Sequence, residues 1–137
     1  AGTVERWERF SPYLVEAGIP LAVAVQDGAT IESVQSLSPA PDVVCVGGST
    51  EWKWKTAAMW AGAYPRTHLL RCNAPDKLYW LESIGYESCD GTGWSRGDRK
   101  QTEGLEMWAR SQAEPVKNLL WPHVCRAKKQ KLQETFA

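Results

Sequence analysis

The stretch LAVAVQDGATIESVQSLSPAPDVVCVGG, residues 21–48, contains two short apolar runs separated by a polar segment. The runs LAVAVQ (21–26) and DVVCVGG (42–48) are nearly continuous and rich in valine, which is typical of strands that are covered on both faces. The segment between them is long enough for a short helix. This order predicts two parallel strands joined by a helical crossover.

The same pattern continues along the chain. THLLRC (67–72) predicts a third strand, and the more polar YESCDG (86–91) predicts a fourth. Helical patterns flank and separate these runs, at residues 4–18, 49–65, 73–85 and 99–112. Because strands recur every ~20–25 residues, which is tight for a doubly wound sheet, the sequence predicts an α/β fold of TIM-barrel type, either a (β/α) barrel or a partial barrel.

Two helix boundaries carry specific expectations. Pro12 lies inside the first helical pattern and is expected to break or kink that helix. In the third pattern, Asn73 is a candidate N-cap and Pro75 suits the first turn.

The pattern divides the chain into a half-barrel-like catalytic domain, residues 1–111, and a helical, basic tail, residues 112–137. Four (β/α) units make half of a TIM barrel, which leaves two open sheet edges. Three arrangements would resolve this: the chain is a fragment of a larger barrel, a second copy or a partner completes the barrel, or the sheet is small and open. The first residue is not methionine, which favours a processed product or a fragment.

Composition narrows the range of partners. The 16 basic and 16 acidic side chains balance, so overall charge gives no argument for nucleic-acid binding, although a local basic groove remains compatible with it. No apolar run approaches the ~18 residues of a membrane span, and no signal peptide opens the chain. We therefore expect a cytoplasmic protein with no membrane partner.

The chain has four cysteines, Cys45, Cys72, Cys89 and Cys125, and none forms a CxxC pair. This spacing argues against a zinc ribbon or a thioredoxin-like site. We expect reduced, buried thiols, as is usual in a cytoplasmic protein.

Polar residues and glycines follow every predicted strand, at the end where parallel α/β folds bind ligands. These candidate substrate-binding residues are Gln26, Asp27, Gly47, Gly48, Ser49, Arg71 and, further along, Arg96. The glutamine amide can pair with a planar heterocycle, the paired glycines let a flat ligand approach the backbone, and the arginines can hold a phosphate. The structural alternatives are a satisfied rim amide, tight turns, a cap on the next helix by the aspartate, and exposed salt bridges.

Asp90 is the candidate catalytic residue at the end of the fourth strand. Its carboxylate can act as a nucleophile or general base, or it can simply form an Asx turn with Gly91. Cys89 is an alternative nucleophile without an obvious base. His68 lies inside the third predicted strand, where a half-buried, satisfied histidine is the usual interpretation.

Eight tryptophans are more than a core of this size needs. Trp52, Trp54 and Trp94 follow the strand ends and can stack on bases. For Trp60, Trp80 and Trp108 we expect packing in the core or burial between the sheet and a helix.

Three motifs in chain order, VAVQDG, VVCVGGSTEWK and IGYESCDGTGWSR, resemble the tRNA-guanine transglycosylase family. The fit is best in the third motif, where Gly85, Glu87, Asp90 and Arg96 fall on matching positions and Ser95 stands where the family has threonine. The resemblance covers roughly residues 19–100. The wording GGSTEWK is similar to a shorter, phage- and actinobacteria-associated branch of transglycosylase-like proteins.

The resemblance implies a TIM barrel that exchanges guanine for a 7-deazaguanine base, as in queuosine formation, in tRNA or DNA. Asp90 would form a covalent aspartyl-ribosyl intermediate, Gln26 would contact the base edge, and Gly47 and Gly48 would present backbone groups to it. No cofactor is expected, and no metal, because the zinc-binding cysteine cluster of the family has no counterpart here. The alternatives are a non-catalytic 7-deazaguanine- or nucleotide-binding module and a structural α/β domain.

Overall fold

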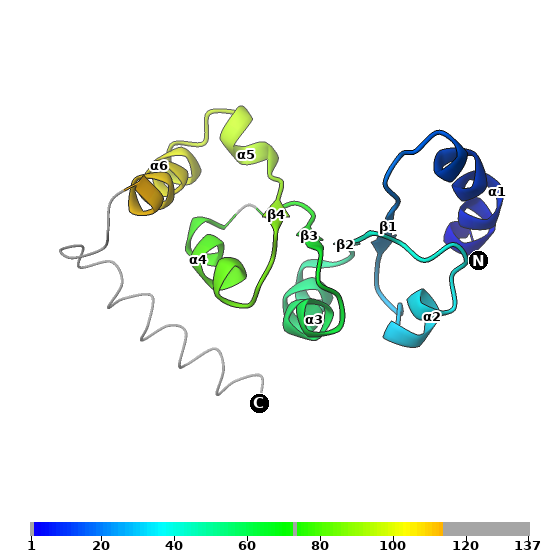
Figure 1. The fold of residues 1–137 in the computed structure, drawn as a ribbon. Helices are drawn as coiled ribbons and strands as arrows, with labels where there is room; N and C mark the ends of the chain where they lie inside the picture. Colours follow the sequence, from blue (N-terminus) through cyan, green and yellow to red (C-terminus); the bar gives the residue numbers. More distant parts are fainter. Residues whose placement is uncertain (1, 73, 114–137) are drawn as a thin grey trace. The chain divides into compact units, whose positions relative to one another are not determined.

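The computed structural model describes residues 2–72 and 74–113, which form two compact units. The first unit comprises residues 2–70 and 85–89, and the second comprises residues 71–84 and 90–113 (Figure 1). Except for its first two residues, the tail expected at 112–137 lies outside the described residues.

A parallel sheet forms the centre of the first unit. Its strands are β1 (Ala22–Val25), β2 (Val43–Val46), β3 (Thr67–Leu69) and β4 (Ser88–Cys89). They pair in the order β1-β2-β3-β4, with every pair parallel. The α/β class and the parallel sheet are therefore confirmed, and each strand falls inside its predicted run. Within the described residues this is an open four-stranded sheet, and a closed barrel is not shown.

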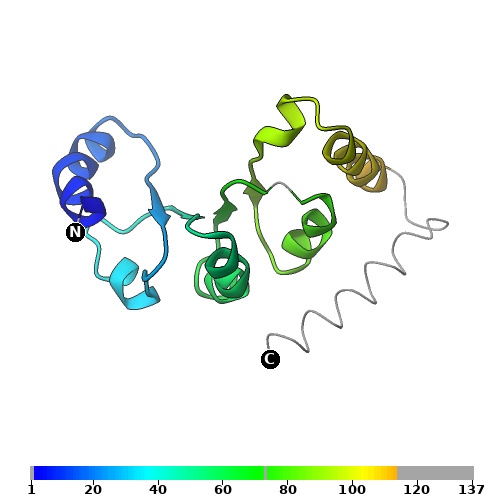
Figure 2. The same ribbon diagram turned by 180° about the vertical axis from the view of Figure 1, so that it is seen from behind.

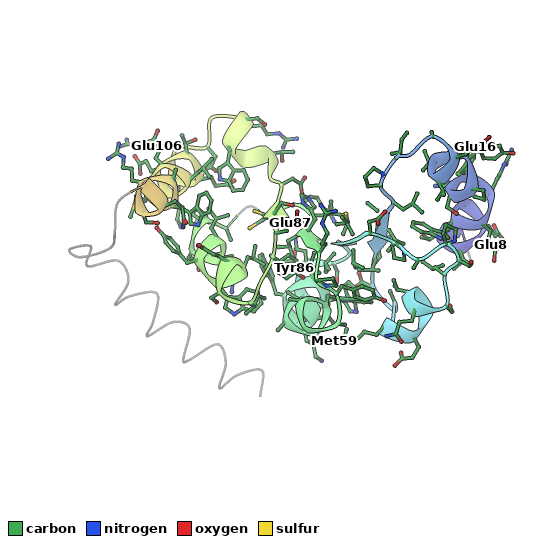
Figure 3. All side chains as sticks on the ribbon, viewed as in Figure 1. Glu8, Glu16, Met59, Tyr86, Glu87 and Glu106 are labelled. Atoms are coloured by element: carbon green, nitrogen blue, oxygen red, sulfur yellow. The ribbon has the colours of Figure 1, made fainter. Side chains whose placement is uncertain are left out.

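Three helices complete the first unit: α1 (Gly2–Glu16), α2 (Ile31–Gln35) and α3 (Thr50–Ala63). Figure 1 and the reverse view in Figure 2 both show α2 and α3 on the same side of the sheet, with α1 across β1 from α2. The side chains of Glu8 and Glu16 lie on the side of α1 that faces away from β1 (Figure 3). The expected break at Pro12 is wrong, because α1 continues through it. The carbonyl that loses its helical partner belongs to the exposed Glu8, where water can replace it.

The core of the first unit lies on one face of the sheet. The buried side chains on this face are Val23, Val25, Val44, Val46, Thr67 and Leu69. They alternate with exposed or half-buried residues on the other face, which is therefore less covered than expected, although α1 flanks it at β1 (Figure 1). Trp60 of α3 is fully buried, as expected, and its ring lies 6.2 Å from that of Tyr64.

Buried and exposed side chains also alternate in the two residues before β4, where Tyr86 is buried and Glu87 is exposed. The Tyr86 hydroxyl donates a 3.1 Å hydrogen bond to the carbonyl of Ala57 in α3, and burial raises the pKa of Tyr86. Glu87, the next residue, instead forms a two-bond ion pair with Arg66 at 2.9 and 3.0 Å. The labelled side chains of Tyr86 and Glu87 can be followed in Figure 3. This ion pair lowers the pKa of Glu87 and gives a structural reason for an acid at this position.

The second unit contains α4 (Pro75–Ser83), α5 (Thr92–Ser95) and α6 (Arg99–Ala113). Helix α4 has Ala74 at its N-cap position and Pro75 in its first turn; the candidate cap Asn73 lies outside the described residues. Helices α4 and α6 pack closely, because a Cβ added at Gly104 would overlap Pro75. The indole of Trp108 donates a 3.2 Å hydrogen bond to Glu82.

Trp80 and Trp108 are only half-buried, so their assignment to the core is wrong. Each has a polar contact that favours partial exposure. The Lys77 ammonium lies 5.5 Å from the centre of the Trp80 ring, and the Trp108 indole N–H donates to the exposed carboxylate of Glu82. None of the helices in the described part of the chain is long and apolar enough to cross a membrane.

Candidate functional site

Asp27 follows β1 and binds the beginning of α3. Its carboxylate accepts hydrogen bonds from the backbone N–H of Ser49 at 2.6 Å and from the Ser49 hydroxyl at 2.5 Å. Ser49 is the N-cap of α3. The alternative that Asp27 caps the next helix is wrong, because Thr30 caps α2 in a capping box with Ser33. Asp27 therefore connects the ends of two neighbouring strand–helix turns.

Gly48 allows this contact. Its φ is +81°, in the left-handed region, and a Cβ here would overlap the Asp27 carboxylate and lie 3.0 Å from the Trp52 ring. At Gly47, a Cβ would lie 3.1 Å from Leu70 Cδ1. Other residues of the chain therefore fill the space where a side chain at Gly47 or Gly48 would lie. This supports the alternative that the two glycines are needed for a tight turn. Contact of their backbone groups with a ligand stays a prediction.

Replacing Asp27 with asparagine is expected to destabilise the first unit slightly at neutral pH. The hydrogen bonds from the Ser49 side chain and backbone favour the carboxylate and lower the pKa of Asp27 below its ordinary value of 3.8. A lowered pKa in the folded state stabilises the fold fully above pH 3.8, and this contribution disappears as the pH falls through the folded-state pKa.

Urea unfolding at several pH values measures this effect. The difference in midpoint between the wild type and Asp27→Asn should be present at pH 7 and shrink below pH 3.8. The control Glu51→Gln removes a charge from the first turn of α3 and leaves Asp27 in place, so it keeps the hydrogen bonds between Asp27 and Ser49. A difference that stays constant down to acidic pH would contradict the role given to the Asp27 carboxylate.

Asp90 comes directly after β4 and belongs to the second unit. Its Oδ1 accepts a 2.6 Å hydrogen bond from the backbone N–H of Arg71, and its carbonyl accepts a 2.5 Å bond from that of Cys72. Arg71 has a φ of 56°, in the left-handed region that side chains rarely adopt. Asp90 therefore holds a strained backbone segment, a feature that concentrates at functional sites. Its side chain is exposed.

Arg96 lies at the end of α5, beside a hollow of about 440 Å³ in the second unit. The other residues that line it are Thr92, Gly93, Gly97, Asp98 and Gln101. A Cβ at Gly93 would overlap the end of the Gln101 side chain, which would then have to move. This hollow is lined by polar groups and glycines, and it contains both the guanidinium of Arg96 and the carboxylate of Asp98.

Gln26 is exposed at the end of β1. It lines a cavity of about 380 Å³ between α1 and β1, together with Trp7 and Phe10 among others. An amide beside indole and phenyl rings offers both hydrogen-bonding groups and an apolar surface to a planar ligand.

The structure thus gathers the candidate residues into separate groups. Asp27, Gly48 and Ser49 form one contact network in the first unit, where Gly47 and Gln26 also lie. Arg71 and Asp90 form a second contact in the second unit, which also contains Arg96. The described residues contain no cluster of three histidine, cysteine, aspartate or glutamate side chains that could hold a metal ion.

Lys53 is a buried cation that sequence reasoning missed. Its side chain is 4% exposed, and its Nζ donates a 2.9 Å hydrogen bond to the carbonyl of Leu70, just after β3. Lys53 stands four and seven residues before the buried Ala57 and Trp60, which is the spacing of one helix face and could have revealed its burial. Its Nζ also lies 5.3 Å from the centre of the Trp54 ring, which is a cation–π contact.

Comparisons of the chain with protein-family models, with curated proteins and with solved structures found no match. What the structure defines is the class of protein, an α/β protein with a parallel sheet and polar residues after its strands. Its relation to the transglycosylases therefore stays a hypothesis.

Proposed function

We propose that this chain is a transglycosylase-like protein that exchanges guanine for a 7-deazaguanine base in tRNA or DNA. The observation that carries the proposal is the position of Asp90: an exposed carboxylate directly after the last strand of a parallel sheet, bonded to the strained backbone of Arg71. The strand order supports a barrel-type fold, because sequential parallel strands without a reversal are the pattern of a (β/α) barrel.

The chemistry proceeds in two displacements. A carboxylate oxygen of Asp90 bonds to C1′ of the sugar as the glycosidic C–N bond breaks, and guanine leaves with the electron pair and takes up a proton. A nitrogen of the incoming base then attacks C1′, loses its proton, and releases the carboxylate. Two displacements retain the configuration at C1′, and the carboxylate stabilises the positive charge that develops on the sugar.

The other residues have supporting roles in this proposal. Gln26 contacts the edge of the base, and the backbone of Gly47 and Gly48 approaches its plane. Arg71 and Arg96 bind phosphates of the nucleic acid, which must present the nucleotide outside its stack. A second copy or a partner that completes the barrel would supply the strands that this four-stranded sheet does not contain.

Base exchange can be measured directly. Structured RNA and DNA carrying radiolabelled guanine are incubated with the chain and a 7-deazaguanine, and the release of labelled guanine is followed. We expect time-dependent release from one of the two nucleic acids. If a second copy completes the barrel, the rate should rise more steeply than linearly with chain concentration.

Two outcomes would contradict catalysis. Saturable binding of 7-deazaguanine without any release of guanine would favour the non-catalytic binding module. The absence of both binding and release would favour a structural α/β domain, in which Asp27 and Asp90 serve only the intrachain hydrogen bonds described above.

A further inference from the structure

A row of side chains crosses the less covered face of the sheet in the first unit. The strand register aligns Ala24 with Cys45, Cys45 with His68, and His68 with Ser88. All three pairs lie on the face opposite the buried valines, because side chains alternate along each strand. Cys45 and His68 are half-buried, and Ser88 is exposed, so small molecules can reach this row.

Histidine stands between the thiol and the hydroxyl in this row. The Nδ1 of His68 lies 2.8 Å from the Ser88 Oγ, a hydrogen bond that fixes the orientation of the ring. Neighbouring strands are about 4.8 Å apart, so side chains paired in register on one face are within reach of each other. When Nδ1 donates its proton to Ser88, the other ring nitrogen, Nε2, is the one that can accept a proton from Cys45.

We propose that Cys45, His68 and Ser88 form a nucleophilic thiol site, distinct from the transglycosylase residues, that reacts with small uncharged carbon electrophiles. His68 accepts the thiol proton, and Ser88 positions the imidazole. A nucleophile, a base within reach and a third group that orients the base are the arrangement that thiol catalysis requires. Ala24 leaves room on the other side of Cys45, and the row itself carries no permanent charge, which suits an uncharged reactant.

The contrast with Cys89 supports the assignment. Cys89 is also half-buried, but it pairs with the buried Leu69 and therefore points to the face away from His68. The expectation of burial is wrong for Cys45 and Cys89, which are both half-buried, and it is confirmed for Cys72.

Iodoacetamide is a suitable probe of this site. The Cys45 sulfur forms a bond to carbon as the carbon–iodine bond breaks, iodide leaves, and the thiol proton passes to His68 and then to water. After short exposure of the whole chain, mass spectrometry of peptides gives the labelling rate at each cysteine. We expect Cys45 to react at least ~10-fold faster than Cys89, which serves as the internal reference.

Two variants test the roles of the neighbours. His68→Gln keeps a hydrogen-bond donor toward Ser88 but removes the base, and should slow Cys45 labelling at least ~10-fold while leaving Cys89 unchanged. Ser88→Ala, on the exposed edge strand, should slow Cys45 by a smaller factor. If His68→Gln disturbs the fold, the far-ultraviolet circular dichroism spectrum and the urea unfolding midpoint will change, and Ser88→Ala then decides.

The proposal is overturned if Cys45 reacts no faster than Cys89, or if Ser88→Ala leaves the Cys45 rate unchanged in a folded chain. Neither result would affect the transglycosylase proposal, because the residues that it uses are different and its readout is base exchange.

Discussion

Replacing Asp90 with asparagine is expected to abolish covalent attachment of nucleic acid to the protein. An amide is a far weaker nucleophile than a carboxylate, so a reaction that proceeds through an aspartyl-ribosyl intermediate should slow by at least ~10³-fold. Asparagine has nearly the same shape and keeps an oxygen that can accept the bond from the Arg71 N–H. The substitution therefore removes the chemistry while preserving most of the local structure.

The measurement is denaturing gel electrophoresis of labelled RNA or DNA after incubation with the chain. The wild type should show a band of protein-bound nucleic acid, and Asp90→Asn should show none. Addition of a 7-deazaguanine should discharge the wild-type band as the incoming base displaces the enzyme.

Glu103→Gln is the matched control. Glu103 is also an exposed acidic residue of the second unit, and its Oε1 accepts a 2.7 Å hydrogen bond from Nε of Arg99. It lies within α6, so it does not follow a strand, and it is not among the residues that line the hollow beside Arg96. An adduct that persists in Asp90→Asn, or that disappears equally in Glu103→Gln, would contradict a nucleophilic role for Asp90.

Replacing Trp60 with alanine should have the largest effect on stability. Trp60 is fully buried, with its ring 6.4 Å from that of Trp52 and stacked on Tyr64 at 6.2 Å. Loss of a buried indole removes apolar contact and leaves a cavity, which lowers the free energy of unfolding by about 3–5 kcal/mol. That is a large share of the stability of a small domain.

Two further variants of α3 test whether the cost of Trp60→Ala comes from the loss of a buried ring. Trp60→Phe keeps an aromatic ring and removes an indole N–H for which the described residues provide no hydrogen-bond partner, so its cost should stay below about 1.5 kcal/mol. Met59→Ala changes an exposed neighbour and should alter stability by no more than about 0.5 kcal/mol. Urea unfolding followed by far-ultraviolet circular dichroism measures all three. Equal costs for Trp60→Ala and Met59→Ala would show that Trp60 does not hold the core together.

The sequence determined the elements of this protein. Valine-rich runs, glycines and prolines mark strands and helix ends through local sterics and side-chain periodicity, so the four strands, the main helices and the α/β class were predictable. The short α5 was not, because its glycine-rich stretch resembles a loop. The continuity of α1 through Pro12 was not either, since the cost of a lost hydrogen bond depends on whether water can replace it.

Only the tertiary structure decided which side chains meet. Asp27 and Ser49 are 22 residues apart in sequence, and the register of β2, β3 and β4 alone places Cys45, His68 and Ser88 in one row. The burial of Lys53 likewise depends on the carbonyl of Leu70, which a different strand supplies. Local propensity is a property of neighbouring residues, whereas these contacts follow from how the strands pair across the sheet.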